Sequence, residues 1–281
     1  MSSDRFEVTF WGVRGSIPTP GPTTVHFGGN TICVEVICGD HRLIVDSGSG
    51  LRVLGKHLLS QMPVRATMFF THFHWDHIQG FPFFTPAFIP GNHFDIYGES
   101  KLNSNVNKVL QGQMMDPNFP VSLEDMNAEM RFHHISPGDR FDLEGGIHVR
   151  TASLRHPGSA ISYRIEYGGR VLVTGWDTEH PAEGVDATLL EQAKDADVLI
   201  YDATYDDDDY FGRLGGPPKI GWGHSTWQRG LELVEAANVE RVFFIHHDPL
   251  YDDARLHAIE RAAREQNPSA TVAVEGTTIS L

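Results

Sequence analysis

One short stretch of the chain concentrates side chains that bind metal ions. Residues 72–77 read His-Phe-His-Trp-Asp-His, which places three imidazoles and one carboxylate within six positions. The stretch follows the apolar segment 66–71, and alternate side chains at the end of a strand share one face. The aspartate and the last histidine come on the turn into the next segment, so they can be aimed at an adjoining point. The spacing therefore predicts a metal site.

Further metal-binding side chains follow other apolar segments. His156, Asp177 and the pair His246-His247 each come directly after, or just beyond, a run that reads as a strand. A histidine after a strand is more often solvated or hydrogen-bonded than metal-bound. Loops at strand ends are nevertheless where α/β sheets assemble their sites. Together with residues 72–77, these positions predict a centre with two metal ions.

The elements that must position these side chains are short strands with interspersed helices. Segments rich in Val, Ile, Phe and Tyr, bounded by Gly, Pro, Asp or Asn, predict strands at 7–11, 31–38, 42–46, 66–71, 93–97, 147–152, 161–167, 170–174, 197–201, 241–245 and 271–274. Helical periodicity predicts helices at 50–59, 101–113, 187–194, 226–237 and 253–265. Ser225 and Gln228 have the spacing of a capping box at the start of the fourth helix.

The order of these elements indicates one α/β domain over residues 1–281. No long Ser/Gly/Pro linker and no block of charge divides the chain. Residues 117–120 and 206–218 are rich in Pro, Gly and Asp, and we expect them to be surface loops inside that domain.

Composition narrows the classes of function. The chain has 281 residues, 40% of them hydrophobic, and a formal net charge of −15. That apolar content can build a core, so overall disorder is excluded. The negative charge disfavours a nucleic-acid polymer or an anionic membrane as partner. No apolar run could span a bilayer and no signal peptide opens the chain. Cys33 and Cys38 fall on opposite faces of one predicted strand and cannot pair there. We expect a cytoplasmic protein.

The combination of motifs resembles the metallo-β-lactamase fold hydrolases, whose fold is an αββα sandwich and whose defining motif is His-x-His-x-Asp-His. The sequence is most similar to the phosphodiesterase branch, which includes ribonuclease Z and the anti-Pycsar cyclic-nucleotide phosphodiesterases of bacteria and phages. The segments that point to this branch are Trp-Gly-Val-Arg-Gly-Ser at 11–16, Gly-Gly-Asn-Thr at 28–31, Val-Asp-Ser-Gly at 45–48 and Gly-His-Ser-Thr at 223–226.

The resemblance implies a ligand set for two divalent ions. One ion is held by three histidines and the second by an aspartate and two histidines, while a further aspartate bridges both. In this sequence the first set is His72, His74 and His156, the second is Asp76, His77 and His246, and the bridge is Asp177. In the family the first histidine of the pair at 246–247 is the ligand. Imidazoles and carboxylates suit Zn²⁺, and Mn²⁺ or Fe²⁺ are compatible with them.

The resemblance also implies a mechanism. Two metal ions share a water, lower its pKa and stabilise charge on a phosphoryl group. His224 would donate a proton to the leaving oxygen, Asp202 would orient it, and both would join Asp76 in the catalytic set. Ribonuclease Z usually has His-Glu-Ala-Thr where this chain has Tyr-Asp-Ala-Thr at 201–204, so Asp202 is one methylene shorter. A solvated loop carboxylate is the alternative for Asp202. Asp46 would support the metal-binding loop by hydrogen bonds.

Three residues are weaker candidates for substrate contacts. Arg14 and Ser16 lie in a Gly-rich loop after the first strand and could donate to a phosphate, although a turn with a solvated arginine is the alternative. Trp222 could stack on a base, as could the Phe-rich segment 81–84. That segment is equally compatible with core packing or a dimer contact.

Substrate size follows from the spacing of two ligands. Only residues 157–176 separate His156 from Asp177, and two predicted strands fill them. Ribonuclease Z carries its tRNA-gripping arm at this place, and no room remains for it here. With the negative charge, this disfavours tRNA. We expect a dinuclear metal-dependent phosphodiesterase that hydrolyses 3′,5′-cyclic nucleotides, or a similarly small cyclic phosphate, to the monophosphate. The resemblance implies a homodimer.

Three alternatives remain open at this stage. A lactonase or other carboxylic-ester hydrolase could use the same metal pair, and a tRNA 3′-processing endonuclease is disfavoured by the missing arm. The third alternative is a binding protein that sequesters a nucleotide messenger without cleaving it.

Overall fold

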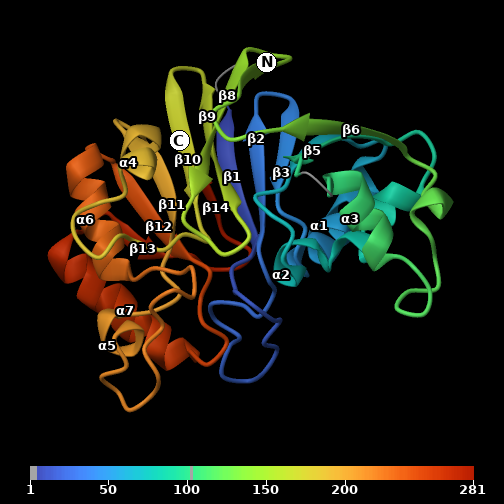
Figure 1. Cartoon of the computed structure of the whole chain (residues 1–281). Coiled ribbons are helices and arrows are strands. Elements are labelled where there is room, and N and C mark those ends of the chain that lie inside the picture. Colours follow the sequence, from blue (N-terminus) through green and yellow to red (C-terminus); the bar gives the residue numbers. More distant parts are fainter. Residues whose placement is uncertain (1–4, 102–103) are drawn as a thin grey trace.

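Two β-sheets form the centre of the molecule. The computed structural model describes residues 5–101 and 104–281. Each sheet has seven strands, and the two pack face to face with helices on both outer sides (Figure 1). Helices α1 and α3 cover one sheet, whereas α4, α6 and α7 cover the other (Figure 1). The αββα sandwich expected from the sequence is thereby confirmed.

Strand order defines the two sheets. The first sheet has the order β14 (Thr278–Ser280), β1 (Phe6–Gly12), β2 (Cys33–Cys38), β3 (His41–Val45), β4 (Arg65–Phe69), β5 (His93–Glu99) and β6 (Glu129–Ile135). The second has the order β13 (Ala270–Val272), β12 (Arg241–Ile245), β11 (Val198–Asp202), β10 (Arg170–Gly175), β9 (Ala160–Tyr167), β8 (Ile147–Leu154) and β7 (Arg140–Leu143).

The helices are mostly short. The α-helices are α1 (Gly50–Leu58), α2 (Trp75–Ile78), α3 (Val106–Gln113), α4 (Ala187–Ala193), α5 (Asp207–Tyr210), α6 (Trp227–Ala237) and α7 (Asp253–Gln266). Single 3₁₀ turns occur at Leu59–Gln61, Phe81–Phe83, Thr85–Phe88 and Leu123–Asp125.

Parallel pairing sets up the functional edge. Strands β10, β11, β12 and β13 are mutually parallel, and Tyr201 pairs with both Gly175 and Phe244. Strands β3 to β6 are parallel in the other sheet. All five residues of β11 are buried, as expected for a parallel strand covered on both faces. The residues that follow β10, β11 and β12 therefore emerge side by side.

Three apolar layers hold the sandwich together. The middle layer joins the inner faces of both sheets and includes Phe10, Phe69, Tyr163 and Trp176, all fully buried. The other two layers lie between each sheet and its helices. Cys33 and Cys38 belong to different layers and are both free, which confirms that they do not pair.

One predicted helix begins later than its periodicity indicated. Helix α3 starts at Val106 rather than at residue 101, because the Asn105 side chain accepts a hydrogen bond from the Lys108 backbone N–H and caps the helix there. Lys101 instead forms an isolated bridge with Ser104, and residues 102–103 of the predicted helix lie outside the described residues. A side chain that accepts from the free N–H groups of the first turn fixes where a helix begins, even within a sequence that has helical periodicity on both sides.

The predicted capping box at the start of α6 is wrong by one residue. Thr226, not Ser225, is the N-cap, and its hydroxyl accepts from the Arg229 N–H. The Ser225 hydroxyl lies instead between Tyr201 Oη at 2.8 Å and His180 Nδ1 at 2.9 Å. It is therefore committed to a buried polar chain behind the site.

Other local expectations are settled by burial. Phe81 and Phe84 are fully buried against the first sheet, so core packing holds for them, while Phe83 is exposed. Residues 157–176 are occupied by β9 and β10, as expected. The structure adds three strands that the sequence did not indicate, β6, β7 and β14. Across the described residues, no helix has the length and apolar character needed to cross a bilayer.

Candidate metal centre

Four loops bring histidine and aspartate side chains to one point. They follow β4, β8, β10 and β12, at the end of the sandwich that carries α2 (Figure 1). One group consists of His72, His74 and His156, whose nearest ring nitrogens lie within 4.8 Å of one another. His74 Nδ1 is 3.0 Å from His156 Nε2. Three nitrogens this close suit a single metal ion, and solvent reaches the group because His74 is exposed and His156 is only partly buried.

A second group lies beside the first. Asp76, His77 and His246 also offer ligand atoms within 4.8 Å of one another. Asp76 Oδ2 is 3.3 Å from His77 Nε2 and 3.2 Å from His246 Nε2. Two of the groups of close ligand atoms thus contain the same residues as the two sets that the resemblance implied, and a further group of His72, His77 and Asp177 overlaps both.

Asp177 lies between the two groups. Its Oδ1 is 3.6 Å from Nε2 of both His72 and His156, which belong to the first group. The same carboxylate is 3.3 Å from His246 Nε2 and 3.2 Å from His77 Nε2 in the second group. A carboxylate that faces both groups is placed to bridge two cations.

Unpaired buried atoms test whether a metal fits here. His72 Nε2, His77 Nε2 and Asp177 Oδ2 are buried and have no hydrogen-bond partner among the described residues. Buried polar atoms are normally satisfied, because leaving one unpaired costs about 1–3 kcal/mol. All three atoms point into the same cluster of donors. The residues present therefore fit divalent metal ions.

The buried carboxylates and imidazoles of the cluster shift one another's pKa values. Burial disfavours the Asp177 anion, but the imidazoles of His246, His77 and His72 outweigh it and hold the Asp177 pKa well below its usual range. Burial lowers the pKa of His72 well below its usual value. For His246 burial also acts downward, yet Asp177 and Asp76 raise its pKa to about 9.

Asp46 supports the ligand loop from beneath. The Asp46 carboxylate is fully buried and accepts four hydrogen bonds, each of 2.8 Å, from Thr71 N–H, Thr71 Oγ1, His77 Nδ1 and Trp176 Nε1. The Thr71 hydroxyl, having donated to Asp46, lies 3.1 Å from His72 Nδ1. A carboxylate accepts only, so Nδ1 of His77 carries a proton and Nε2 is the atom that faces the centre.

Two other ligands are oriented in the same way. His156 Nδ1 donates to the Gly223 carbonyl at 2.8 Å. His246 Nδ1 is 2.9 Å from Thr204 Oγ1, which itself donates to Asp202 Oδ1 at 2.9 Å. In both histidines Nδ1 is therefore the outward donor, and Nε2 is the atom that faces the cluster and would bind a metal in place of a proton.

Strained backbone is concentrated at these residues. Ser16, Asp46, Asp177 and His246 have φ between 58° and 66°, a left-handed conformation that non-glycine residues seldom adopt. Such conformations persist where the surrounding structure enforces them, commonly at functional sites. The backbone is held so that these side chains or amides turn toward the centre.

His224 stands beside both groups and is anchored by Asp202. His224 Nδ1 lies 2.9 Å from Asp202 Oδ2. The His224 ring centroid is 5.1 Å from that of His156 and 4.6 Å from that of His246. Asp202 is fully buried and also accepts from the Asp177 N–H at 2.9 Å, so it is not a solvated loop carboxylate. Burial opposes its ionisation, but the neighbouring His224 lowers its pKa.

His247 is turned away from the centre. Its Nε2 donates to the Ala273 carbonyl at 3.0 Å, and burial lowers its pKa to about 3. The contrast with His246 agrees with the expectation that the first histidine of the pair faces the metals.

The family of the chain is decided by comparison with known proteins. The family model described as "Beta-lactamase superfamily domain" matches residues 41–247, well over half of the chain. The chain belongs to the beta-lactamase superfamily. It is a metal-dependent hydrolase, and membership of this superfamily implies divalent metal ions at the centre described above.

Individual relatives are distant but span most of the chain. The chain is similar to ribonuclease Z of Picrophilus torridus, with 25% identity over 90% of this chain and 89% of the relative. The metallo-beta-lactamase fold protein YhfI of Bacillus subtilis has a TM-score of 0.73 at 16% identity, covering 99% and 100% of the two chains. A diphosphatase of the PhnP family has a TM-score of 0.70 at 17% identity, covering 99% and 98%. At these identities the solved structures establish the fold.

Arg14 does not make the phosphate contact that was expected from the sequence. Its side chain is fully buried, and its guanidinium donates to the carbonyls of Gly28, Asp248 and Tyr251. The expectation of a phosphate contact is therefore wrong, because Arg14 ties together loops from distant parts of the hydrolase. The alternative of a solvated arginine is wrong for the same reason.

Ser16 and Trp222 lie at the edge of the candidate metal centre. The Ser16 backbone N–H, not its hydroxyl, donates to Asp76 Oδ2 at 2.7 Å. The Trp222 side chain is 51% exposed, and Lys219 Nζ lies 4.4 Å from its ring centroid. Trp222 thus offers an open aromatic surface two residues before His224.

Several supporting groups could not be found from the sequence. Thr204 orients His246, Trp176 donates to Asp46, and the Gly223 carbonyl orients His156. The last is a backbone atom, and backbone acceptors leave no mark on residue type. Thr204 had a signal, because it belongs to the segment Tyr-Asp-Ala-Thr that the sequence already singled out.

Proposed function

We propose that this hydrolase is a dinuclear phosphodiesterase that converts small cyclic phosphates, foremost 3′,5′-cyclic nucleotides, into monophosphates. The five histidines and two aspartates of the centre favour two Zn²⁺ ions, and Mn²⁺ or Fe²⁺ would find the same ligands. Bound there, the ions supply a nucleophilic water at neutral pH and take up charge from the phosphoryl group.

The observation that carries the proposal is the position of His224. Breaking a phosphate ester expels an alkoxide, which needs a proton as it leaves. His224 lies against ligands of both metal groups, and the buried Asp202 carboxylate fixes its Nδ1. The Nε2 atom is then available to donate to a leaving oxygen. The site thus combines cation binding with a placed acid, which phosphodiester cleavage requires.

Two further features support a small substrate. Residues 157–176, between His156 and Asp177, are taken up by β9 and β10. The net charge of −15 opposes close approach of a long polyanion. Trp222 provides an exposed ring beside His224 on which a base can stack. A single nucleotide matches these features better than a tRNA precursor.

The test compares substrate classes on one preparation. We expect the purified, metal-replete protein to hydrolyse bis(p-nitrophenyl) phosphate and 3′,5′-cyclic nucleotides in a chelator-sensitive manner, and to leave a homoserine lactone intact. Rapid lactone hydrolysis without phosphodiester hydrolysis would identify a lactonase on the same metal centre. Cleavage of a tRNA precursor in preference to cyclic nucleotides would identify a ribonuclease. Tight binding of an uncleaved cyclic nucleotide would indicate a messenger-binding protein.

Two expectations about the molecule in the cell accompany this proposal. The homodimer implied by the sequence resemblance is tested by sedimentation velocity, and the cytoplasmic location by fractionation. Both remain predictions.

A further inference from the structure

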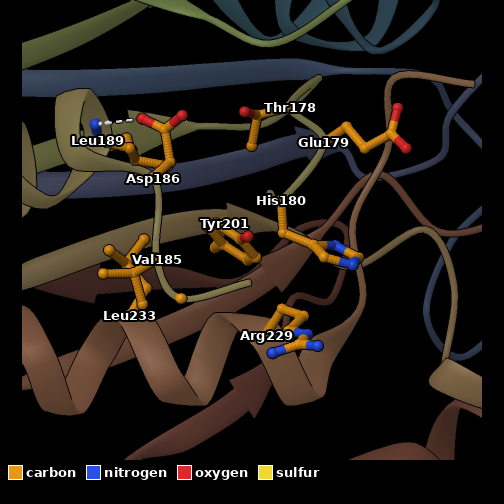
Figure 2. A pocket seen from close by; sticks show the side chains of 10 residues that line it. Thr178, Glu179, His180, Val185, Asp186, Leu189, Tyr201, Arg229 and Leu233 are labelled. Atoms are coloured by element: carbon orange, nitrogen blue, oxygen red, sulfur yellow. Dashed lines mark hydrogen bonds between the residues drawn. The ribbon is translucent and has the colours of Figure 1, made fainter. Parts of the chain in front are cut away.

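The loop 219–225 carries His224, and two of its backbone amides donate to Glu179, a residue outside the predicted site. Glu179 lies two positions after the bridging Asp177, and Figure 2 shows its carboxylate turned away from His180. We infer that Glu179 is a positioning residue, which holds this loop against the metal centre and thereby places His224. The inference rests on the phosphodiesterase function proposed above.

The Glu179 carboxylate accepts three hydrogen bonds through its two oxygens. Its Oε1 accepts from the Tyr210 hydroxyl at 2.6 Å and from the Gly221 N–H at 2.7 Å. Its Oε2 accepts from the Gly223 N–H at 2.9 Å. Two amides of one tight loop therefore converge on a single side chain. Hydrogen bonds to an ionised acceptor are stronger than neutral ones, so this carboxylate can fix the loop conformation.

The loop has little freedom to compensate for a lost contact. Gly221 and Gly223 both have positive φ, at 85° and 88°. A side chain on Gly223 would have its Cβ 2.2 Å from the Pro157 ring and 2.5 Å from His156 Nδ1. The loop therefore approaches the ligand His156 so closely that only glycine fits.

Two routes lead from this loop to the centre. The Gly223 carbonyl accepts from His156 Nδ1 at 2.8 Å, so the peptide held by Glu179 also orients a metal ligand. The next residue is His224, whose Nδ1 lies 2.9 Å from Asp202 Oδ2. Asp202 fixes the ring of His224, whereas Glu179 fixes the backbone that carries it. Both are needed to hold Nε2 at one place.

Tyr210 connects this arrangement to the acidic segment before it. Tyr210 ends α5 (Asp207–Tyr210) and is 4% exposed. Burial and the contact with Glu179 raise the Tyr210 pKa, so its hydroxyl keeps the proton that it donates. It is a second, weaker determinant of where the Glu179 carboxylate lies.

The substitution Glu179→Gln changes this geometry with little change of shape. An amide has only one acceptor oxygen, so either orientation sets an NH₂ group against a donor, at Gly223 or at Tyr210 and Gly221. We expect kcat for 3′,5′-cyclic nucleotides to fall about 10- to 100-fold, part of the 10²–10⁴ that a general acid contributes. Hydrolysis of bis(p-nitrophenyl) phosphate should change less than about threefold, because p-nitrophenolate leaves without a proton.

The experiment compares Glu179→Gln, His224→Ala and the double variant on both substrates, with Glu183→Gln as the matched control. Glu183 is an exposed carboxylate four positions further along the same segment. If Glu179 acts mainly through His224, the double variant should be no more than about threefold slower than His224→Ala alone, the margin left for its second route through Gly223 and His156. Hydrogen exchange of the 221–223 amides should also be faster in Glu179→Gln and unchanged in Glu183→Gln, even in metal-free protein.

The outcomes separate the two claims. Equal losses on both substrates, additive losses in the double variant, or unchanged exchange at 221–223 would overturn the role of Glu179. If His224→Ala itself does not distinguish the substrates, the role of His224 as proton donor in the proposed function fails, and if the wild type cleaves neither substrate, the proposed function itself fails. Amide exchange then still decides whether Glu179 holds the loop. Tyr210→Phe, which removes one donor and leaves both amides bound, should give a smaller loss than Glu179→Gln and serves if the latter folds poorly.

Discussion

The Nδ1 atom of His224 lies 2.9 Å from Oδ2 of Asp202, and the same oxygen accepts the Asp177 N–H at 2.9 Å. One buried carboxylate at the end of β11 thus fixes both the imidazole beside the centre and the backbone of the bridging ligand. The parallel register of β10 and β11 brings Asp177, which follows β10, beside Asp202 at the end of β11. The imidazole that we propose as proton donor and the backbone of Asp177 are therefore held by the same carboxylate.

Removing the imidazole of His224 should separate catalysis from metal binding. We expect His224→Ala to lower kcat for cyclic nucleotides by about 10²–10⁴-fold, the contribution typical of a general acid. Metal content should stay at the wild-type value, because the three-residue groups around each ion remain complete. Steady-state kinetics and elemental analysis of the same sample check both statements. Undiminished turnover would remove the assigned role.

The adjacent histidines at 246 and 247 provide a matched pair for the metal prediction. We expect two divalent ions per chain in the wild type and in His247→Gln, and one fewer in His246→Ala, because only His246 faces Asp76 and Asp177. Elemental analysis after dialysis against a weak chelator measures the stoichiometry. Equal loss of metal from both variants would show that the orientation of this pair is misassigned.

Asp46 should matter for stability more than its single charge indicates. Asp46→Ala leaves four buried donors without an acceptor, and we expect the free energy of unfolding to fall by about 3 kcal/mol or more. The control is Asp95→Ala, which likewise removes a carboxylate. Asp95 is bonded to two histidines, His93 and His133. Asp95 is partly exposed, so about 1 kcal/mol or less is expected there. Similar losses in urea denaturation would contradict the role of Asp46.

His247 predicts a pH dependence of stability. Burial lowers its folded pKa to about 3, while an unfolded histidine titrates near 6.5. Below pH 6.5 the unfolded chain therefore binds the proton that the folded chain excludes, so this residue destabilises the fold as pH falls toward 3. Between pH 7 and pH 5 we expect the wild type to lose about 2 kcal/mol relative to His247→Gln. Parallel losses in both proteins would refute the assignment.

The ligand set was accessible from sequence because its information lies in side chains at fixed spacing. Residues 72–77 carry four of the candidate ligands, and His156, Asp177 and His246 come directly after, or just beyond, the apolar strands β8, β10 and β12. The contacts of Arg14 were not predicted because two of its three partners, the carbonyls of Asp248 and Tyr251, lie 234 and 237 positions away along the chain. A loop arginine looks the same in sequence whether it faces a phosphate or three backbone oxygens.

The prediction of local structure failed where a single side chain or a tertiary pairing overrides the periodicity of the sequence. Asn105 caps α3 in the middle of a run that reads as helical. The strand β6 is built from Glu-Met-Arg-Phe-His-His-Ile and has a mixed burial pattern, so its pairing with β5 defines it more than its composition does. Glu179 was missed for a related reason, since two of its three partners are backbone amides.

The central claim is chelator-sensitive hydrolysis of a small cyclic phosphate at this centre. The most direct measurement incubates the metal-replete protein with a panel of cyclic mononucleotides and a linear dinucleotide, with and without chelator, and identifies the products by mass. We expect conversion of 3′,5′-cyclic mononucleotides to monophosphates that stops when metal is removed. If none of the panel is cleaved while a lactone is hydrolysed, the metal centre stands and the proposed substrate class is wrong.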